Sequence, residues 1–421
     1  MPDYIKQVTV TGDISKIGDQ VVINRFIKQD DILRTWCVEI SKEISEQKAE
    51  FAVVHVQGLL TVVNPDYAAR VILGWADDVQ YFDRFSNTGY HPIRKGHEHC
   101  IGVTECDGYI QNTFNQKYTF RKEFYVSYLY FNKTDLILRK IYVILLFIKY
   151  NLKTSTWIYL FQREDGTRDL SQQRTGFLLA RFRIHGKELT FVNLNLHSVP
   201  FEDVNEIVEQ PQVTKAAQKR EEQIQALLTE LEAEGLRNDA ILVAGSFNTQ
   251  LHETKLLTYL AKTQMVSTVS KKDDTGKVEA IKHIDRHGRV GLYFYKDITT
   301  VERSRFDLHS IHDWFFRIGR GQMVKRYNGE LAPITFKGQL LEESVFFQPS
   351  RHYNLNEAGK EEFMRNLCPA WADRILYNDK MDSLFRHDSF CASGLYYGLV
   401  AEQTYVGQHK PVALHASICL K

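Results

Sequence analysis

Short apolar runs of strand length alternate with amphipathic segments along this chain. Residues 8–12 (VTVTG) and 50–58 (EFAVVHVQG) have the apolar, β-branched composition of strands. The segment between them, 31–48, has a helical pattern. The start of the chain therefore predicts a strand, a helix and a second strand.

A hairpin is predicted in the middle of the chain. Residues 176–184 (GFLLARFRI) and 189–197 (LTFVNLNLH) both have strand character, and the polar HGKE between them has the composition of a turn. Two strands joined this closely should pair antiparallel.

The clearest helix follows the hairpin. Residues 214–234 are charged except for an apolar stripe at helical spacing, formed by Ile224, Leu227, Leu228 and Leu231. Gly235 is a typical helix stop, and 240–245 (AILVAG) is apolar throughout, as in a buried strand. Hairpins combined with intervening helices predict an α/β fold of two packed sheets with helices outside.

Residues 265–345 have only patchy periodicity. His283 and His287 have the i, i+4 spacing of a helical metal site, but Gly288 follows at once and no third ligand is near. The GRG at 319–321 lacks the Gly-Lys-Ser/Thr ending of a phosphate loop and is interpreted as a turn.

Composition and charge restrict the classes of function. The 421 residues are 43% hydrophobic, enough for one large domain or two. Lys and Arg number 53 against 52 Asp and Glu, so there is no global attraction to nucleic acid or to anionic membranes. Any site for a polyanion must be local.

The cysteines and the apolar runs bear on location. The six cysteines show no CxxC spacing, which argues against a zinc cluster or a dense disulfide frame and favours a reducing compartment. The first residues lack the apolar run of a signal peptide, and 141–148 (IYVILLFI) is too short to span a bilayer and predicts a buried strand. Cys419 is third from the end, not fourth as a prenylation box requires. We expect a cytoplasmic protein with no transmembrane segment, able to associate peripherally with membranes.

Several apolar strands end in polar residues. These are VVHVQG, FVNLNLH, ILVAGSFN and YVGQHKPVALHASI, and CPAWADRIL at 368–376 places a tryptophan beside an Asp-Arg pair. Each has a structural interpretation on its own. Gly245 ends a strand, Asn248 caps a helix, Trp371 belongs to the core, and His409 is as often structural as catalytic.

Taken in order, these stretches resemble the inositol polyphosphate 5-phosphatases, especially the type I enzymes that act on soluble inositol phosphates. ILVAGSFN is similar to the family's Gly-Asp-x-Asn strand end, CPAWADRIL to its Pro-Ala-Trp-Cys-Asp-Arg-Ile-Leu motif, and GQHKPV to its Gly/Ser-Asp-His-Lys-Pro-Val motif. FFQPS at 346–350 and TGFLLARF at 175–182 are similar to two further family segments.

The resemblance implies a fold and a chemistry. The fold is the endonuclease/exonuclease/phosphatase-like four-layer α/β/β/α sandwich, with two central mixed sheets flanked by helices. It implies a single domain over residues 1–421, with a poorly matched insertion around 265–345. Hydrolysis of the phosphate ester in the family uses Mg²⁺, a base that directs water at phosphorus, and donors for the developing charge.

The family's charged positions are largely substituted here. The resemblance places Gly58 and Thr11 at metal positions, and glycine has no ligand atom. Asn195 stands for the histidine that contacts the reacting phosphate, and an amide carries no positive charge. Ser246 stands for the aspartate that acts as general base, and Gln408 for the aspartate that orients the retained His409.

Some of the other family positions are retained, and some of the basic ones are lost. The family's catalytic positions also include Asn248 and Asp373, both present. Basic residues are lost at Thr175, Gln250 and Leu367. The substrate-binding candidates that remain are Arg351, Arg374 and Lys410.

These substitutions lead to one main hypothesis and three alternatives. The first is a pseudophosphatase that folds and binds an inositol phosphate, a phosphoinositide headgroup or a protein partner without turning it over. The alternative is an active Mg²⁺-dependent phosphatase that removes the 5-phosphate of inositol 1,4,5-trisphosphate and related compounds, with replacement ligands such as His197, Glu253 or Asp13. A nuclease or sphingomyelinase is disfavoured by the phosphatase motifs and the neutral charge balance. A structural or scaffolding role remains open.

Overall fold

Two mixed sheets pack face to face and form the body of the described fold. The computed structural model describes residues 4–14, 29–49, 51–57, 126–131, 156–160, 176–184, 187–198, 214–233, 235–252, 267–272, 274–275, 278–284, 290–295, 339–356, 358–364, 367–387 and 389–419. The predicted strand at 141–148, Gly58, Thr175, Glu253 and His287 lie outside these ranges.

The first sheet has the strand order β15-β16-β1-β2-β3. Its strands are β1 (Tyr4–Asp13), β2 (Phe51–Gln57), β3 (Val126–Phe131), β15 (Tyr396–Leu399) and β16 (Val412–Cys419). β1 pairs in parallel with β2 and antiparallel with β16, so strands from the two ends of the chain lie side by side.

The second sheet has the order β11-β14-β7-β6-β5-β4. Its strands are β4 (Thr156–Leu160), β5 (Gly176–Ile184), β6 (Lys187–Asn195), β7 (Ala240–Ser246), β11 (Leu341–Glu342) and β14 (Asp373–Tyr377). The predicted hairpin is present as β5 and β6, which pair antiparallel from Gly176↔Asn195 to Ile184↔Lys187.

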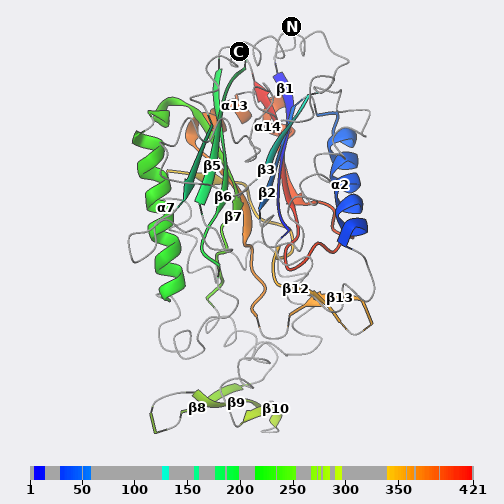
Figure 1. The fold of residues 1–421 in the computed structure, drawn as a ribbon, viewed down its shortest axis with the longest axis vertical. Helices are drawn as coiled ribbons and strands as arrows, with labels where there is room; N and C mark the ends of the chain where they lie inside the picture. The colour runs from blue at the N-terminus through cyan, green and yellow to red at the C-terminus, as the bar shows by residue number, and fades with distance from the viewer. Residues whose placement is uncertain are drawn as a thin grey trace.

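A helix covers the outer face of each sheet. Figure 1 shows α2 (Gln29–Glu46) outside the first sheet and α7 (Lys215–Ala233) outside the second. The apolar stripe of α7 packs on the second sheet in a buried cluster that includes Ile224, Leu227, Leu231, Val192 and Val243. The predicted α/β sandwich of two mixed sheets flanked by helices is therefore confirmed.

The remaining elements are short. They are η3 (Leu236–Asn238), β8 (Ser267–Lys272), β9 (Val278–Ile284), β10 (Val290–Tyr295), β12 (Tyr353–Leu355), β13 (Glu361–Phe363), α13 (Asp379–Phe385) and α14 (Ser389–Ser393). Strands β8, β9 and β10 form a sheet of their own within the segment of patchy periodicity. His283 lies in β9, so its spacing to His287 is not that of a helical metal site.

Strand alternation decides which side chains face the space between the sheets. In β1, Val8, Val10 and Gly12 face α2, and a Cβ atom at Gly12 would lie 2.8 Å from the Trp36 ring of that helix. Successive side chains of a strand point to opposite faces, so Thr11 and Asp13 face the second sheet. The interior of the sandwich is thus polar at the end of β1.

Gly245 allows β7 to approach β6 closely. A Cβ atom at this position would lie 1.9 Å from the carbonyl oxygen of Leu194 on the paired strand. No larger residue fits without moving the backbone. The glycine therefore fixes the position from which the chain continues into Ser246 and Asn248.

A disulfide joins Cys391 of α14 to Cys419 at the end of β16, with the two Cα atoms 6.4 Å apart. Among the described cysteines, Cys37 and Cys368 are buried and take part in no disulfide. Disulfides are typical of oxidising compartments, so this bond weighs against the reducing compartment expected from the cysteine spacing. No helix in the described part of the chain has both the length and the apolar composition needed to cross a bilayer.

Candidate active site

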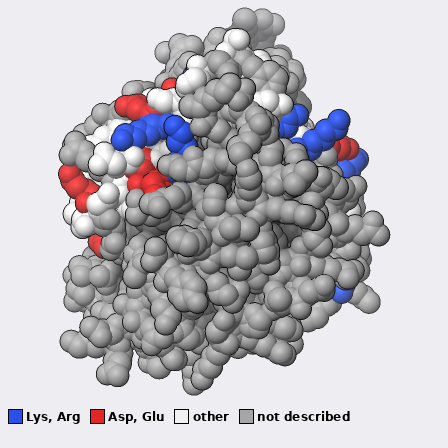
Figure 2. All heavy atoms as spheres, turned by 90° about the horizontal axis from the view of Figure 1, so that it is seen from above, with Lys and Arg blue, Asp and Glu red and all other residues white. Residues whose placement is uncertain are grey.

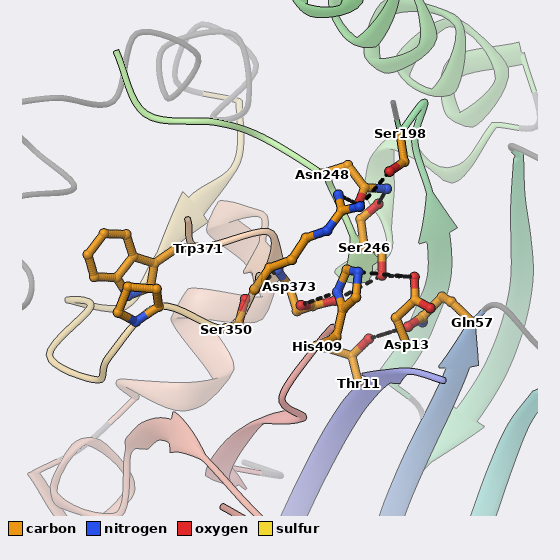
Figure 3. A network of polar contacts seen from close by, with 12 residues as sticks. Thr11, Asp13, Gln57, Ser198, Ser246, Asn248, Ser350, Trp371, Asp373 and His409 are labelled. Atoms are coloured by element: carbon orange, nitrogen blue, oxygen red, sulfur yellow. Dashed lines mark hydrogen bonds and ion pairs between the residues drawn. The ribbon is translucent and has the colours of Figure 1, made fainter. Parts of the chain in front are cut away.

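Three strand ends bring a serine, two aspartates and a histidine together between the sheets. The Ser246 Oγ atom lies 2.9 Å from Asp13 Oδ2 and 2.8 Å from Asp373 Oδ1. His409 Nδ1 lies 2.8 Å from Asp373 Oδ2, and its Nε2 lies 3.9 Å from Asp13 Oδ2. Figure 3 shows these four side chains pointing toward one another. We call Asp13, Ser246, Asp373 and His409 the central network.

The sheet register explains how the central network assembles. Asp373 of β14 and Ser246 of β7 are antiparallel partners, so their side chains are on the same face. Asp13 belongs to β1 in the opposite sheet. The contact between Ser246 and Asp13 is therefore a buried hydrogen bond from one sheet to the other.

A second group of contacts lies beside the central network. Gln57 Nε2 donates to Thr11 Oγ1 at 3.0 Å and to Asn193 Oδ1 at 2.6 Å, and this also links the two sheets. Ser350 Oγ accepts a bond of 2.9 Å from the backbone N–H of Asp373. Sequence reasoning did not single out Asn193 or Ser350, although both face the site.

Arg351 is the basic residue of this region. Its Nη1 donates to Asn248 Oδ1 at 2.6 Å and its Nη2 donates to Ser198 Oγ at 2.7 Å. Asn248 Nδ2 in turn donates to Leu196 O at 2.9 Å and contacts Asn195 Oδ1 at 3.3 Å. The predicted residues Asn195, Asn248 and Arg351 are thus brought together.

Asn248 has a backbone conformation that suits its role. Its φ is +54°, in the left-handed region that asparagine tolerates better than most residues. This turn directs the amide back toward Leu196 and Arg351. The expected helix-capping role is therefore not the one observed, because the amide binds the loop after β6 and the guanidinium.

The structure differs from the sequence-based expectation for Gln408. The carboxylate beside His409 comes from Asp373, while the backbone oxygen of Gln408 accepts from the N–H groups of His352 and Tyr353. The amide at 408 therefore does not deprive His409 of a carboxylate partner. Ser246, which stands for the family's general base, is contacted by two carboxylates.

Arg374 is engaged away from the central network. It follows Asp373 in a strand, so its side chain points to the opposite face, where it forms a bidentate pair with Glu342 at 2.7 and 2.5 Å. Both side chains are buried. Burial alone lowers the pKa of Arg374, but the charge and hydrogen bonds of Glu342 outweigh it and the pKa is raised. This buried pairing argues against the expected contact of Arg374 with substrate.

Lys410 is also committed to structure. Its Nζ contacts Glu361 and donates to the carbonyls of Glu402 at 2.7 Å and Thr404 at 3.1 Å. Burial lowers the pKa of the ammonium, and the charge of Glu361 opposes that shift. Lys410 therefore holds the β12–β13 hairpin in place, which differs from the substrate-binding role expected from the sequence.

His197 and Trp371 were also singled out from the sequence. The backbone N–H of His197 donates to Gln223 Oε1 at 2.7 Å, and its carbonyl accepts from Arg220 Nη1 at 3.2 Å, which holds the loop after β6 against α7. Trp371 is buried and donates from Nε1 to Phe347 O at 2.9 Å, as expected of a core residue.

Within the part of the chain that the structure describes, the side chains of this site do not fit the magnesium ion that the resemblance implies. Mg²⁺ prefers octahedral oxygen ligands, usually one or two carboxylates with waters and phosphate oxygens. Both carboxylate oxygens of Asp373 are engaged, by Ser246 and by His409, and the amide of Gln57 is bonded to Thr11 and Asn193. Within the described ranges, no three His, Cys, Asp or Glu side chains are grouped to hold one metal ion.

The charges of the site are mixed. The central network holds two carboxyl groups, and Arg351 supplies a guanidinium next to it. Figure 2 shows a different part of the molecule, seen from the end where β1 begins, and there too the described basic and acidic side chains lie close to each other. An anion would therefore find its favourable partners near Arg351 and not beside Asp13.

No protein-family model matches the chain. Inositol polyphosphate-5-phosphatase A of Homo sapiens is 25% identical over 244 residues, which cover 57% of this chain and 55% of that protein. The probable type I inositol 1,4,5-trisphosphate 5-phosphatase of Caenorhabditis elegans is 22% identical over 277 residues, with 58% of this chain and 63% of that protein covered. The match spans a little over half the length of these curated relatives.

Similarity to solved structures is low. The inositol polyphosphate 5-phosphatase domain of SPsynaptojanin, in complex with inositol (1,4)-bisphosphate and a calcium ion, has 12% sequence identity and a TM-score of 0.43, covering 99% of this chain and 84% of that one. Over a little more than half of its length, the chain is therefore similar in sequence to inositol polyphosphate 5-phosphatases, and a probable type I enzyme is among these relatives.

Proposed function

We propose that this chain is a type I-like 5-phosphatase homologue that binds an inositol phosphate headgroup without measurably hydrolysing it. The observation that carries the proposal is the state of Ser246. Its side chain is buried and stands where the family has a general base, and two carboxyl groups hold its hydroxyl.

Loss of the base explains the impaired hydrolysis. A neutral serine hydroxyl is too weak a base to take a proton from water near neutral pH. Here the hydroxyl contacts Asp13 and Asp373. Losing a general base costs roughly 10² to 10⁴ in rate. The poor fit to Mg²⁺ removes a further source of transition-state stabilisation.

The chemistry around Arg351 supports binding of a phosphorylated headgroup. A guanidinium held by Asn248 and Ser198 has a fixed orientation, and arginine is well suited to bidentate contact with phosphate. Asn195 and Ser198 are partly exposed beside it and supply uncharged donors. The names of the sequence relatives point to inositol phosphates as the ligand class.

The second candidate function is active hydrolysis, and one observation favours it. Asp13 brings a carboxylate to within 2.9 Å of Ser246 Oγ and 3.9 Å of His409 Nε2, in the region where the family's base would act. On this alternative, Asp13 takes the proton from the attacking water, and the 5-phosphate of inositol 1,4,5-trisphosphate is released.

Binding and turnover must be measured together to separate these functions. The purified chain is titrated with inositol 1,4,5-trisphosphate by calorimetry, and free phosphate is assayed in parallel with and without Mg²⁺. The proposed function predicts saturable binding with no release above the blank. Release that Asp13→Asn abolishes supports the second candidate, and absence of both binding and release contradicts both.

A further inference from the structure

Two carboxyl groups from opposite sheets converge on one hydroxyl. Asp13 comes from β1 and Asp373 from β14, and Ser246 Oγ lies within hydrogen-bond distance of an oxygen of each. All three side chains are buried. A hydroxyl has one hydrogen and donates to one acceptor at a time, so the two carboxyl groups share the single hydroxyl of Ser246.

Like charges brought together away from water repel each other unless something compensates them. A divalent cation is one means of compensation in proteins, and a set of hydrogen bonds is another. Here Ser246 contacts both carboxyl groups, and His409 Nδ1 contacts the second oxygen of Asp373 at 2.8 Å. Protein groups therefore supply the compensation.

We infer that Ser246 prevents this site from binding divalent cations, because its hydroxyl links Asp13 to Asp373. A third carboxylate at position 246 would instead require a metal ion between the three acidic groups. The identity of residue 246 decides between a site bridged by hydrogen bonds and a cation site. This inference concerns the same cavity as the proposed function but does not depend on headgroup binding.

Substitution by aspartate is the direct probe of this inference. The Ser246→Asp variant would bring a third carboxylate within the reach of Asp13 and Asp373, where their oxygens now lie 2.9 and 2.8 Å from the hydroxyl. Three buried carboxylates destabilise the fold unless a cation binds between them. Asparagine has nearly the same size as aspartate and adds an amide donor without a charge, so Ser246→Asn is the matched control.

The test is thermal unfolding of the full chain in EDTA and in increasing Mg²⁺ or Ca²⁺. Ser246→Asp should unfold at lower temperature in EDTA and regain on the order of 3 to 5 °C or more at saturating cation. In the wild-type chain and in Ser246→Asn, the unfolding temperature should not rise with cation concentration in a way that adding Asp13→Asn abolishes.

The wild-type titration keeps the inference falsifiable if Ser246→Asp does not fold. A saturable shift in the wild-type chain that is lost in Asp13→Asn would show that the site accepts a cation with serine present, and would overturn the inference. A Ser246→Asp variant that folds but ignores both cations would overturn it as well. Folding of Ser246→Asp only with a cation supports it.

Discussion

His409 Nδ1 lies 2.8 Å from Asp373 Oδ2, and both side chains are buried. The histidine and its carboxylate are 36 residues apart in sequence and meet because β14 begins beside the segment that leads into β16. The orientation of the imidazole is therefore set by β14 and not by residue 408. The substitution at 408 does not by itself disable His409.

Removing the carboxylate at 373 should disturb His409, whereas adding one at 408 should not. We expect Asp373→Asn to lower the free energy of unfolding by on the order of 3 kcal/mol, because it breaks a buried charged contact. The imidazole ¹⁵N shifts of His409 should change in Asp373→Asn and stay the same in Gln408→Asp. A shift caused by Gln408→Asp alone would contradict the assigned pairing.

Arg351→Lys should weaken binding of inositol 1,4,5-trisphosphate by roughly tenfold or more. Lysine keeps the charge but cannot reproduce the contacts of the guanidinium with Asn248 and Ser198. Calorimetry gives the affinity. Arg386→Lys is the matched control, because Arg386 is partly exposed and pairs with Glu343 and Asp382 instead. Equal losses in the two variants would argue against a ligand site at Arg351.

Arg374 should matter for stability and not for ligand binding. Arg374→Met leaves Glu342 buried without its cationic partner, so unfolding in urea should show a loss of roughly 3 to 5 kcal/mol. Replacing both residues, with Glu342→Leu added, should recover much of that loss. Affinity per folded molecule should be unchanged in Arg374→Met, and a clear drop would restore the substrate role that the sequence suggested.

His55 should make the fold sensitive to acid. Burial lowers the pKa of this histidine to about 3, from about 6.5 in the unfolded chain, so the unfolded state binds the proton first as the pH falls. The free energy of unfolding therefore has its full value with respect to His55 above about pH 6.5. It declines toward pH 3 by up to about 1.4 kcal/mol per pH unit. Urea unfolding between pH 7.5 and 5 should show a shallower pH dependence in His55→Leu than in the wild type. The same change at exposed His387 should have no such effect, and a wild-type slope in His55→Leu would refute the prediction.

The disulfide should contribute measurably to stability. Cys391 and Cys419 are separated by 28 residues, and closing a loop of that length is worth about 3.6 kcal/mol in the chain-entropy model. Cys391→Ser should lower the free energy of unfolding by a similar amount, and dithiothreitol should affect the wild type but not the variant. Free thiols at both positions in the purified, unreduced chain would contradict the bond.

The regular elements were predictable where local signals were strong. The strand at 176–184 matches β5, and the apolar run at 240–245 matches β7 to within a residue, because alternation and apolar length act locally. The stop at Gly235 is also borne out, with a φ of +70° after α7. Boundaries shifted by a few residues elsewhere, as at the start of β6.

The site was less predictable, because its geometry depends on which face of a strand a residue occupies. Asp373 and Arg374 are adjacent in sequence, yet one faces the other sheet and the other pairs with Glu342. Alternation along β1 could have placed Asp13 on the same face as Thr11, but its contact with Ser246 spans 233 residues and two sheets. Such long-range pairing follows from sheet packing and not from local pattern.

The most direct measurement is phosphate release from inositol 1,4,5-trisphosphate by the unmodified chain in Mg²⁺. A variant carrying Gly58→Glu, Asn195→His and Ser246→Asp serves as the restored comparison. We expect no release above the blank from the unmodified chain and measurable release from the restored variant. Mg²⁺-dependent turnover by the unmodified chain, lost on His409→Asn, would contradict the proposal that its catalytic site is impaired.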